Sequence, residues 1–235
     1  MFTKNSKIGI IAAMDEEIQE LKDMAENVST EVISGVTFVS GILGGVNVVM
    51  AKCGIGKVFA AICTQAMILT YKPDLIINIG VGGSLSKNLK IADIAISESV
   101  VQHDMDTSPI GDPYGYLNGL DKVFLPACSE AVSLVKECAD ELGINNEIGV
   151  VASGDCFVSS TEKKSFIIDT FKGIVCEMEG ASVGHVCYVN GTDYCIIRAI
   201  SDSGDEDAKE DYPVSLGKAS KAAMSVMKLF LEKLN

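Results

Sequence analysis

The chain has 235 residues and a formal net charge of −13 at pH 7; 48% of its residues are hydrophobic and 6% are aromatic. This length and apolar content allow one sizeable core, whereas the acidic balance disfavours binding to nucleic acid or to an anionic membrane surface. A core of aliphatic residues and methionine suits a buried parallel sheet covered by helices.

Cysteine usage indicates a reducing compartment. The eight cysteines are spread along the chain without a CxxC pair, and several lie in apolar runs. This pattern favours free thiols over a disulfide framework or a zinc site, and therefore a cytoplasmic location. The N-terminus turns acidic too early for a signal peptide. The uncharged run at residues 32–51 is interrupted by glycine, serine and asparagine, so we expect strands there and no membrane span.

In the first half of the chain, apolar runs and turn residues predict a strand–helix alternation. The expected order is a strand at 7–12, a helix at 14–27, strands at 36–42 and 46–51 joined by a Gly44-Gly45 hairpin turn, a helix at 58–70 and a strand at 75–80.

The second half continues the alternation. The expected order is a strand at 91–101, a long Gly- and Pro-rich loop at 103–119, a helix at 126–142, a strand at 147–153, helices at 161–170 and 178–188, a strand at 194–200 and a final helix at 213–234. We therefore expect an α/β fold in which residues 1–235 form one three-layer α/β/α domain around a mixed, largely parallel sheet.

Glu17 is an acid in an apolar setting. In the predicted helix 14–27 it shares one face with Leu21, Met24 and Val28. Either a functional role or simple interaction with the positive end of the helix dipole explains an acid at this position.

Glu177 and Glu179 introduce the predicted helix 178–188, whose next turns are built from small residues. Small residues permit close packing, so we expect this helix start to be buried. A buried carboxylate needs partners or has a shifted pKa. Compensation of the helix dipole is the alternative explanation.

Arg198 is the only arginine in the chain and lies within the apolar strand 194–200, where its charge must be paired. Asp202 follows the carboxyl end of that strand, the edge at which ligands bind in open α/β sheets. An ordinary turn or helix cap, formed by Ser201-Asp202-Ser203-Gly204, is equally open.

Two glycine clusters, at residues 54–57 and 80–84, lack the spacing of a P-loop or a dinucleotide-binding loop. They predict tight turns at the ends of strands, where the backbone approaches a ligand closely. His103 and His185 show no metal-ligand spacing, and His185 is expected in the core. We expect no metal and no cofactor.

Four segments, IGIIAAMDEE, GIGK, EMEG and RAISD, occur in this order along the chain. Together they resemble the purine nucleoside phosphorylase/nucleosidase superfamily, and most closely the bacterial 5'-methylthioadenosine/S-adenosylhomocysteine nucleosidases, over roughly residues 7–234. The resemblance implies hydrolysis of these nucleosides, and of 5'-deoxyadenosine, to adenine and the 5-thioribose or deoxyribose product. It also implies a homodimer in which residues 101–117 lie near the partner's pocket.

The resemblance implies a role for each matching residue. Glu17 activates the attacking water and Asp202 protonates adenine N7. The implied substrate contacts are Gly83 in the ligand-lining turn, Phe157 stacking on adenine, Val158 pairing with the base edge through its backbone, Met178 packing on the sugar, Glu179 binding the ribose hydroxyls, and Tyr212 near the 5'-alkylthio group.

Arg198 is expected to support Glu179 or the ribose side of the substrate. The sequence departs from many relatives at Val81, where they have serine, and in the loop that follows His103-Asp104.

Three alternatives remain open from the sequence. A phosphorylase needs a dianion clamp, commonly built with arginine, although lysines can substitute in part. Hydrolysis of a related nucleoside, such as a 6-amino-deoxyfutalosine-like compound, would share the adenine and ribose contacts. A purine nucleoside-binding protein without turnover would retain the same acids.

Overall fold

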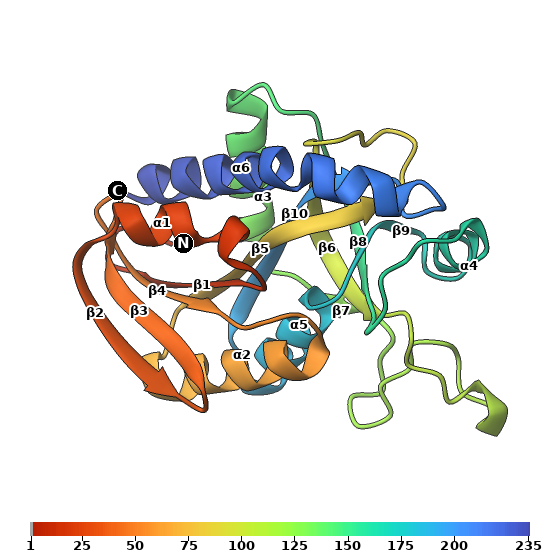
Figure 1. Ribbon diagram of the computed structural model, residues 1–235. Coiled ribbons are helices and arrows are strands. Elements are labelled where there is room, and N and C mark those ends of the chain that lie inside the picture. The colour runs from red at the N-terminus through yellow and green to blue at the C-terminus, as the bar shows by residue number, and fades with distance from the viewer. Residues whose placement is uncertain (1) are drawn as a thin grey trace.

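The computed structural model describes residues 2–235, whose strands form one ten-stranded sheet with helices on both faces (Figure 1). The strands are β1 (Lys7–Ala12), β2 (Glu26–Ile33), β3 (Val36–Leu43), β4 (Val46–Lys52), β5 (Leu75–Ser84), β6 (Ile94–Gln102), β7 (Leu125–Pro126), β8 (Asn146–Ser153), β9 (Gly173–Glu177) and β10 (Asp193–Asp202). The helices are α1 (Gln19–Met24), α2 (Lys57–Tyr71), α3 (Ser129–Glu141), α4 (Thr161–Phe171), α5 (Gly180–Asn190) and α6 (Ala208–Leu234), with 3-10 turns η1 (Asp15–Glu17) and η2 (Ser108–Ile110).

The sheet is mixed. Its strand order is β10-β6-β8-β9-β5-β1-β4-β3-β2, and β7 pairs with β6 outside this path. Because β5 also pairs with β10, the five strands β5, β9, β8, β6 and β10 form a closed ring. Strand β5 runs parallel to both β1 and β10. The carboxyl ends of these three strands therefore meet at one edge, where open α/β sheets bind their ligands.

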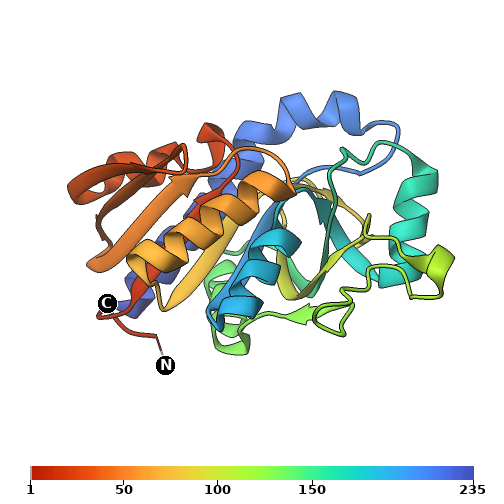
Figure 2. The same cartoon turned by 90° about the horizontal axis from the view of Figure 1, so that it is seen from below.

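Side chains alternate between the two faces of the sheet and build two main cores, and a third, smaller cluster lies beneath α4. In β1, Ile8 and Ile10 join the core beneath α3 and α6, whereas Ile11 joins the core beneath α2 and α5. Figure 2 shows α2 and α5 side by side on one face. Because helices cover both faces of the sheet, the sequences of the central strands are nearly continuous runs of apolar residues.

The predicted α/β class, the mixed sheet and the Gly44-Gly45 hairpin are confirmed. Several boundaries differ. The strand predicted at 75–80 extends to Ser84, the one predicted at 91–101 begins only at Ile94, and the final helix begins at Ala208 and contains Pro213 in its second turn. Strands β2, β7 and β9 were not predicted.

The predicted helix at 14–27 is wrong. The chain forms η1, the short helix α1 and then β2, in which Asn27 has a positive φ of 52°. Pairing of β2 with β3 outweighs the local helical pattern. Met24 and Val28 are each 49% exposed, so they do not share a buried face with Glu17.

Across residues 2–235 no helix combines the length and apolar character that crossing a membrane requires.

Candidate active site

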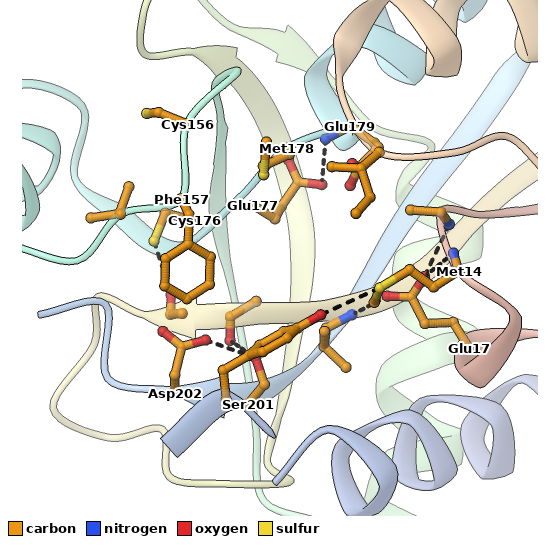
Figure 3. Close-up of a pocket in the computed structure, with 17 residues that line it drawn as sticks. Met14, Glu17, Cys156, Phe157, Cys176, Glu177, Met178, Glu179, Ser201 and Asp202 are labelled. Carbon is orange, nitrogen blue, oxygen red and sulfur yellow. Dashed lines mark hydrogen bonds between the residues drawn. The ribbon is translucent and has the colours of Figure 1, made fainter. Parts of the chain in front are cut away.

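A cavity of about 300 Å³ opens at the edge where β1, β5 and β10 end (Figure 3). Its wall combines apolar side chains with four carboxyls, those of Glu17, Glu177, Glu179 and Asp202. No lysine or arginine is among the described residues of this wall. The remaining lining residues are Ala13, Met14, Ile55, Val81, Gly82, Gly83, Cys156, Phe157, Val158, Cys176, Met178, Ser201 and Tyr212.

Glu17 is 3% exposed and is held by backbone donors alone. Its Oε2 accepts hydrogen bonds from the amides of Ala13 and Met14, both at 2.9 Å, and its Oε1 accepts one from the Val81 amide at 3.0 Å. The approach requires glycine at position 80, since a Cβ there would lie 2.6 Å from Oε1. Burial raises the pKa of Glu17, while the charge of Arg198 and these amides oppose the increase. The result is a rigidly oriented carboxyl suited to a general base.

Arg198 lies behind the cavity wall, 1% exposed, and its main charged partner is Glu177. Its guanidinium also donates to the Asn78 side-chain oxygen at 2.6 Å. Glu177 Oε2, the oxygen that contacts Arg198, also accepts a hydrogen bond from the amide of Gly180 at 2.7 Å. Glu177 Oε1 accepts a hydrogen bond from the Ser153 hydroxyl. This network gives partners to both terminal nitrogens of the buried guanidinium, leaving only its Nε without one among the described residues, and it fixes the start of α5.

Glu179 is the residue preceding α5 and is 6% exposed. Its Oε1 accepts a hydrogen bond from the Gly56 amide at 2.8 Å, and its Oε2 lies 3.7 Å from Arg198 Nη2. Burial, together with the negative charge of Glu177, raises the pKa of Glu179 to about 7. Oε2 keeps free acceptor sites for a ligand that carries hydroxyl donors.

Asp202 ends β10 and is 3% exposed. Its Oδ2 accepts from the Ser201 hydroxyl at 2.8 Å, and its Oδ1 accepts from the Gly204 amide at 2.9 Å. Burial raises the pKa of Asp202, while these two hydrogen bonds lower it. Burial thus favours the neutral acid, the form that can donate a proton to a ligand.

The three carboxyls of Glu17, Glu179 and Asp202 lie on different sides of the cavity in Figure 3. Phe157 and Tyr212 close part of the rim, with ring centroids 5.6 Å apart in an edge-to-face arrangement. The Tyr212 hydroxyl also contacts Met14 Sδ at 3.3 Å. A flat apolar group can therefore lie against Phe157 while polar groups reach the carboxyls.

Every residue predicted for the site lines this cavity except Arg198, which contacts Glu177 directly and Glu179 more distantly. Sequence reasoning missed the wall residues Met14, Ile55 and Cys176. It also missed Asn78, although a lone amide within an apolar strand is a usable signal of a buried polar contact.

The two histidines lie outside the wall. His103 is 2% exposed, and burial lowers its pKa to about 4; His185 is partly buried and contacts Gln102. Within residues 2–235 no group of three or more histidine, cysteine, aspartate or glutamate side chains is arranged to hold a metal ion.

A phosphorylase superfamily model matches residues 7–233. An aminodeoxyfutalosine nucleosidase from Helicobacter pylori is 36% identical over 97% of this chain and 99% of its own length. A 5'-methylthioadenosine/S-adenosylhomocysteine nucleosidase from Exiguobacterium sp. is 37% identical over 94% of this chain and 97% of its own.

Among solved structures, a mutant H. pylori nucleosidase with 5'-methylthioadenosine in its active site superposes with a TM-score of 0.94 at 34% identity, covering 97% of this chain and 99% of that one. The S-adenosylhomocysteine nucleosidase of Streptococcus pyogenes, in complex with 5-methylthiotubericidin, gives the same TM-score at 28% identity, with 98% of each chain covered.

The raised pKa of Glu179 predicts how stability changes with pH. A carboxyl whose folded-state pKa of about 7 exceeds its ordinary 4.5 contributes stability below pH 4.5 that is lost as pH rises through 7. Glu179→Gln removes this titration. We expect the difference in free energy of unfolding, variant minus wild type, to increase by roughly 3 kcal/mol as the pH rises from 4.5 to 8. Urea denaturation across this range, with the exposed Glu210→Gln as control, measures the difference; parallel curves for wild type and Glu179→Gln contradict the prediction.

Proposed function

The chain belongs to the phosphorylase superfamily, and we propose that within it the protein hydrolyses the N-glycosidic bond of 5'-methylthioadenosine and S-adenosylhomocysteine. The products are adenine and the corresponding thioribose; 5'-deoxyadenosine is a further expected substrate. The observation that carries the proposal is the convergence of Glu17, Glu179 and Asp202, from distant stretches of the chain, on one cavity. The named relatives, similar over almost their whole length, support the reaction class.

Cleavage of an N-glycosidic bond passes through an oxocarbenium-like transition state, so both the leaving base and the attacking water need assistance. Asp202, whose neutral form is favoured by burial, donates a proton to adenine N7. Glu17, oriented by three amides, accepts the proton of the water that attacks the anomeric carbon. Glu179 accepts hydrogen bonds from the ribose hydroxyls.

The remaining wall residues bind and orient the nucleoside. Phe157 stacks on the adenine, and the backbone of Val158 pairs with the base edge, while Met178 packs on the sugar. Tyr212 and Met14 form the apolar end that receives the 5'-substituent. Arg198 acts from behind the wall by holding Glu177, which fixes the start of α5 and therefore Glu179.

Charge distinguishes hydrolysis from phosphorolysis. Four carboxyls face the cavity, and no cationic side chain is among its described wall residues. The only arginine, Arg198, is engaged by Glu177 and is buried. A phosphate dianion would find no cationic clamp among these wall residues, so water is the better nucleophile.

Aminodeoxyfutalosine is a second candidate substrate, favoured by the 36% identity to the H. pylori nucleosidase of that name. It shares the adenine and ribose groups and differs at the 5'-substituent. The apolar wall residues Met14 and Tyr212, which contact each other, favour the uncharged methylthio group of 5'-methylthioadenosine over the charged 5'-substituents of aminodeoxyfutalosine and S-adenosylhomocysteine.

A homodimer is also proposed. Helices α2 and α5 lie side by side and expose apolar side chains that a soluble monomer would leave in water, at Val58 (69%), Ile62 (41%) and Val189 (61%). Ile110, in the loop within residues 101–117, is 81% exposed. Dimerisation would cover such residues and bring this loop towards the partner's pocket.

We further propose that the protein works in the cytoplasm, where its thioribose product would enter methionine salvage. The support is the state of its cysteines, all eight of which are free thiols.

Adenine release tests the reaction directly. With 5'-methylthioadenosine in phosphate-free buffer we expect turnover, and added phosphate should leave kcat/KM unchanged because the described wall residues offer it no cationic side chain. The same assay with S-adenosylhomocysteine and with aminodeoxyfutalosine should give a lower kcat/KM for each of them than for 5'-methylthioadenosine. Strict dependence on phosphate would identify a phosphorylase, tight binding without adenine release would identify a binding protein, and the highest kcat/KM for aminodeoxyfutalosine would make that compound the main substrate.

Asp202→Asn should abolish general-acid assistance while preserving the shape of the site. We expect kcat to fall by about 10²–10⁴-fold, with the dissociation constant for a nucleoside analogue within a few-fold of wild type. Stopped assays of adenine and isothermal titration calorimetry measure the two quantities. Normal turnover by this variant would refute the acid assignment.

Val58→Asp tests the dimer without disturbing the fold, because an aspartate in the first turn of α2 interacts favourably with the helix dipole. We expect sedimentation velocity to show a dimer for the wild type and a shift to monomer for this variant. Leu142→Asp, at the end of α3 on the opposite face of the sheet, is the control and should remain dimeric. A monomeric wild type at micromolar concentration rules the dimer out.

A further inference from the structure

The segment that follows Asp202 supplies one of the two hydrogen bonds that orient its carboxyl. Residues 203–207 connect β10 to α6, and the amide of Gly204 donates to Asp202 Oδ1 at 2.9 Å. Gly204 has a positive φ of 65°, a conformation that glycine adopts readily. If this segment moves, the donor moves with it and only the Ser201 hydroxyl still holds the carboxyl, so the orientation of the acid depends in part on how firmly residues 203–207 are held.

Helix α4 holds this segment through two side chains. Lys164 Nζ donates to the Ser203 carbonyl at 2.5 Å and lies 3.1 Å from Asp205 Oδ2. The amide and hydroxyl of Thr161 donate to the two carboxylate oxygens of Glu206, at 2.9 and 2.6 Å. Figures 1 and 2 both show α4 beside the turn that leads into α6.

The contact of Lys164 differs from an ordinary surface ion pair. The side chains of Lys164 and Asp205 are only 23% and 25% exposed, and one ammonium group binds both a backbone carbonyl and a carboxylate. Such a partly buried, multiply bonded charge fixes geometry better than an exposed pair does.

The start of α4 also holds the opposite wall of the cavity. Phe157 and Val158 line the cavity and lead directly into Ser160, whose hydroxyl caps α4 by accepting from the Lys163 amide at 3.3 Å. The start of α4 therefore connects two parts of the proposed site. One is the wall on which the base is proposed to stack, and the other is the segment that helps to orient the proposed acid.

We propose that Lys164 is a positioning residue for Asp202: by fastening residues 203–205 to α4, it keeps the acid at a fixed place relative to Phe157 and Val158. This inference rests on the proposed role of Asp202 as the acid. Lys164 is outside the cavity wall and acts through the loop alone. Its loss should therefore affect the chemical step more than binding, since a displacement of about 1 Å at a reacting group can cost up to 10²-fold in rate.

The test compares Lys164→Met with wild type, with Lys164→Arg and with the control Lys172→Met. Lys172 follows the same helix, and its ammonium group donates to the Asp169 carbonyl, a contact that does not involve residues 203–207. We expect Lys164→Met to lower kcat by about tenfold, within the range above, and to change KM less than threefold. Lys164→Arg should restore most of the turnover, because its longer fork still reaches both acceptors. Lys172→Met should match wild type.

A double variant decides whether Lys164 acts through the acid. In an Asp202→Asn background, Lys164→Met should lower the residual kcat no further, because there is no acid left to position. Equal factors in both backgrounds, or a wild-type kcat for Lys164→Met, would overturn the proposal while leaving the nucleosidase assignment intact. Normal turnover by Asp202→Asn would overturn both the acid assignment and this inference.

Unfolding midpoints are measured for all variants, so that any loss of turnover caused by instability is identified. If Lys164→Met does not fold, Glu206→Ala replaces it, since Glu206 is exposed and contributes only the second fastening to Thr161. We then expect a smaller fall in kcat, about threefold, that again disappears in the Asp202→Asn background. An unchanged kcat, or the same threefold fall in that background, would count against the proposal.

Discussion

One buried positive charge, the guanidinium of Arg198, makes this cluster of acids possible. Glu17, Glu177 and Glu179 are each less than 10% exposed, and the charge of Arg198 favours the ionised form of Glu17 and Glu179. Without it, burying Glu17 and Glu179 in the ionised form would cost several kcal/mol each, or these two carboxyls would be neutral. Because Glu177 holds the guanidinium, and its Oε2 also accepts from the amides of Glu179 and Gly180, the same ion pair fixes the geometry of α5.

Backbone groups complete the site where side chains would not fit. Gly80 lets Glu17 approach β5, and Gly83 does the same for Asp202, since a Cβ there would lie 2.7 Å from Asp202 Oδ1. Gly56 supplies the amide that binds Glu179. The two glycine clusters in the sequence are thus explained by close contact between backbone and carboxyls, and neither needs to be a phosphate-binding loop.

The sequence predicted the fold class, and the three acids that it singled out line the cavity, but not always for the reason given. Glu17 is buried because a 3-10 turn at the end of β1 brings it under the amide of Val81, a contact between residues 64 positions apart. The apolar helical face that suggested its burial does not exist, because β2 pairs with β3 at that point. Asp202 and Glu179 were identified more soundly, since strand and helix ends are marked locally.

What the sequence did not predict depends on contacts between distant segments. Arg198 was expected to be paired, but its main partner, Glu177, lies on β9, a strand that the pattern of residues 173–177 did not reveal. Ile55 and Cys176 join the cavity wall only because several elements converge there. The contacts between residues 203–207 and α4 likewise join segments about 40 positions apart, and the sequence pattern does not distinguish the side chains that form them from ordinary surface polar residues.

The most direct test of the convergence of three acids on one sugar–base bond is a crystal structure with a non-cleavable adenine nucleoside analogue. We expect adenine N7 within hydrogen-bond distance of the Asp202 carboxyl, the ribose hydroxyls on Glu179, and a water between Glu17 and the anomeric carbon. A base bound outside the cavity, or one whose N7 faces away from Asp202, would contradict the proposed chemistry.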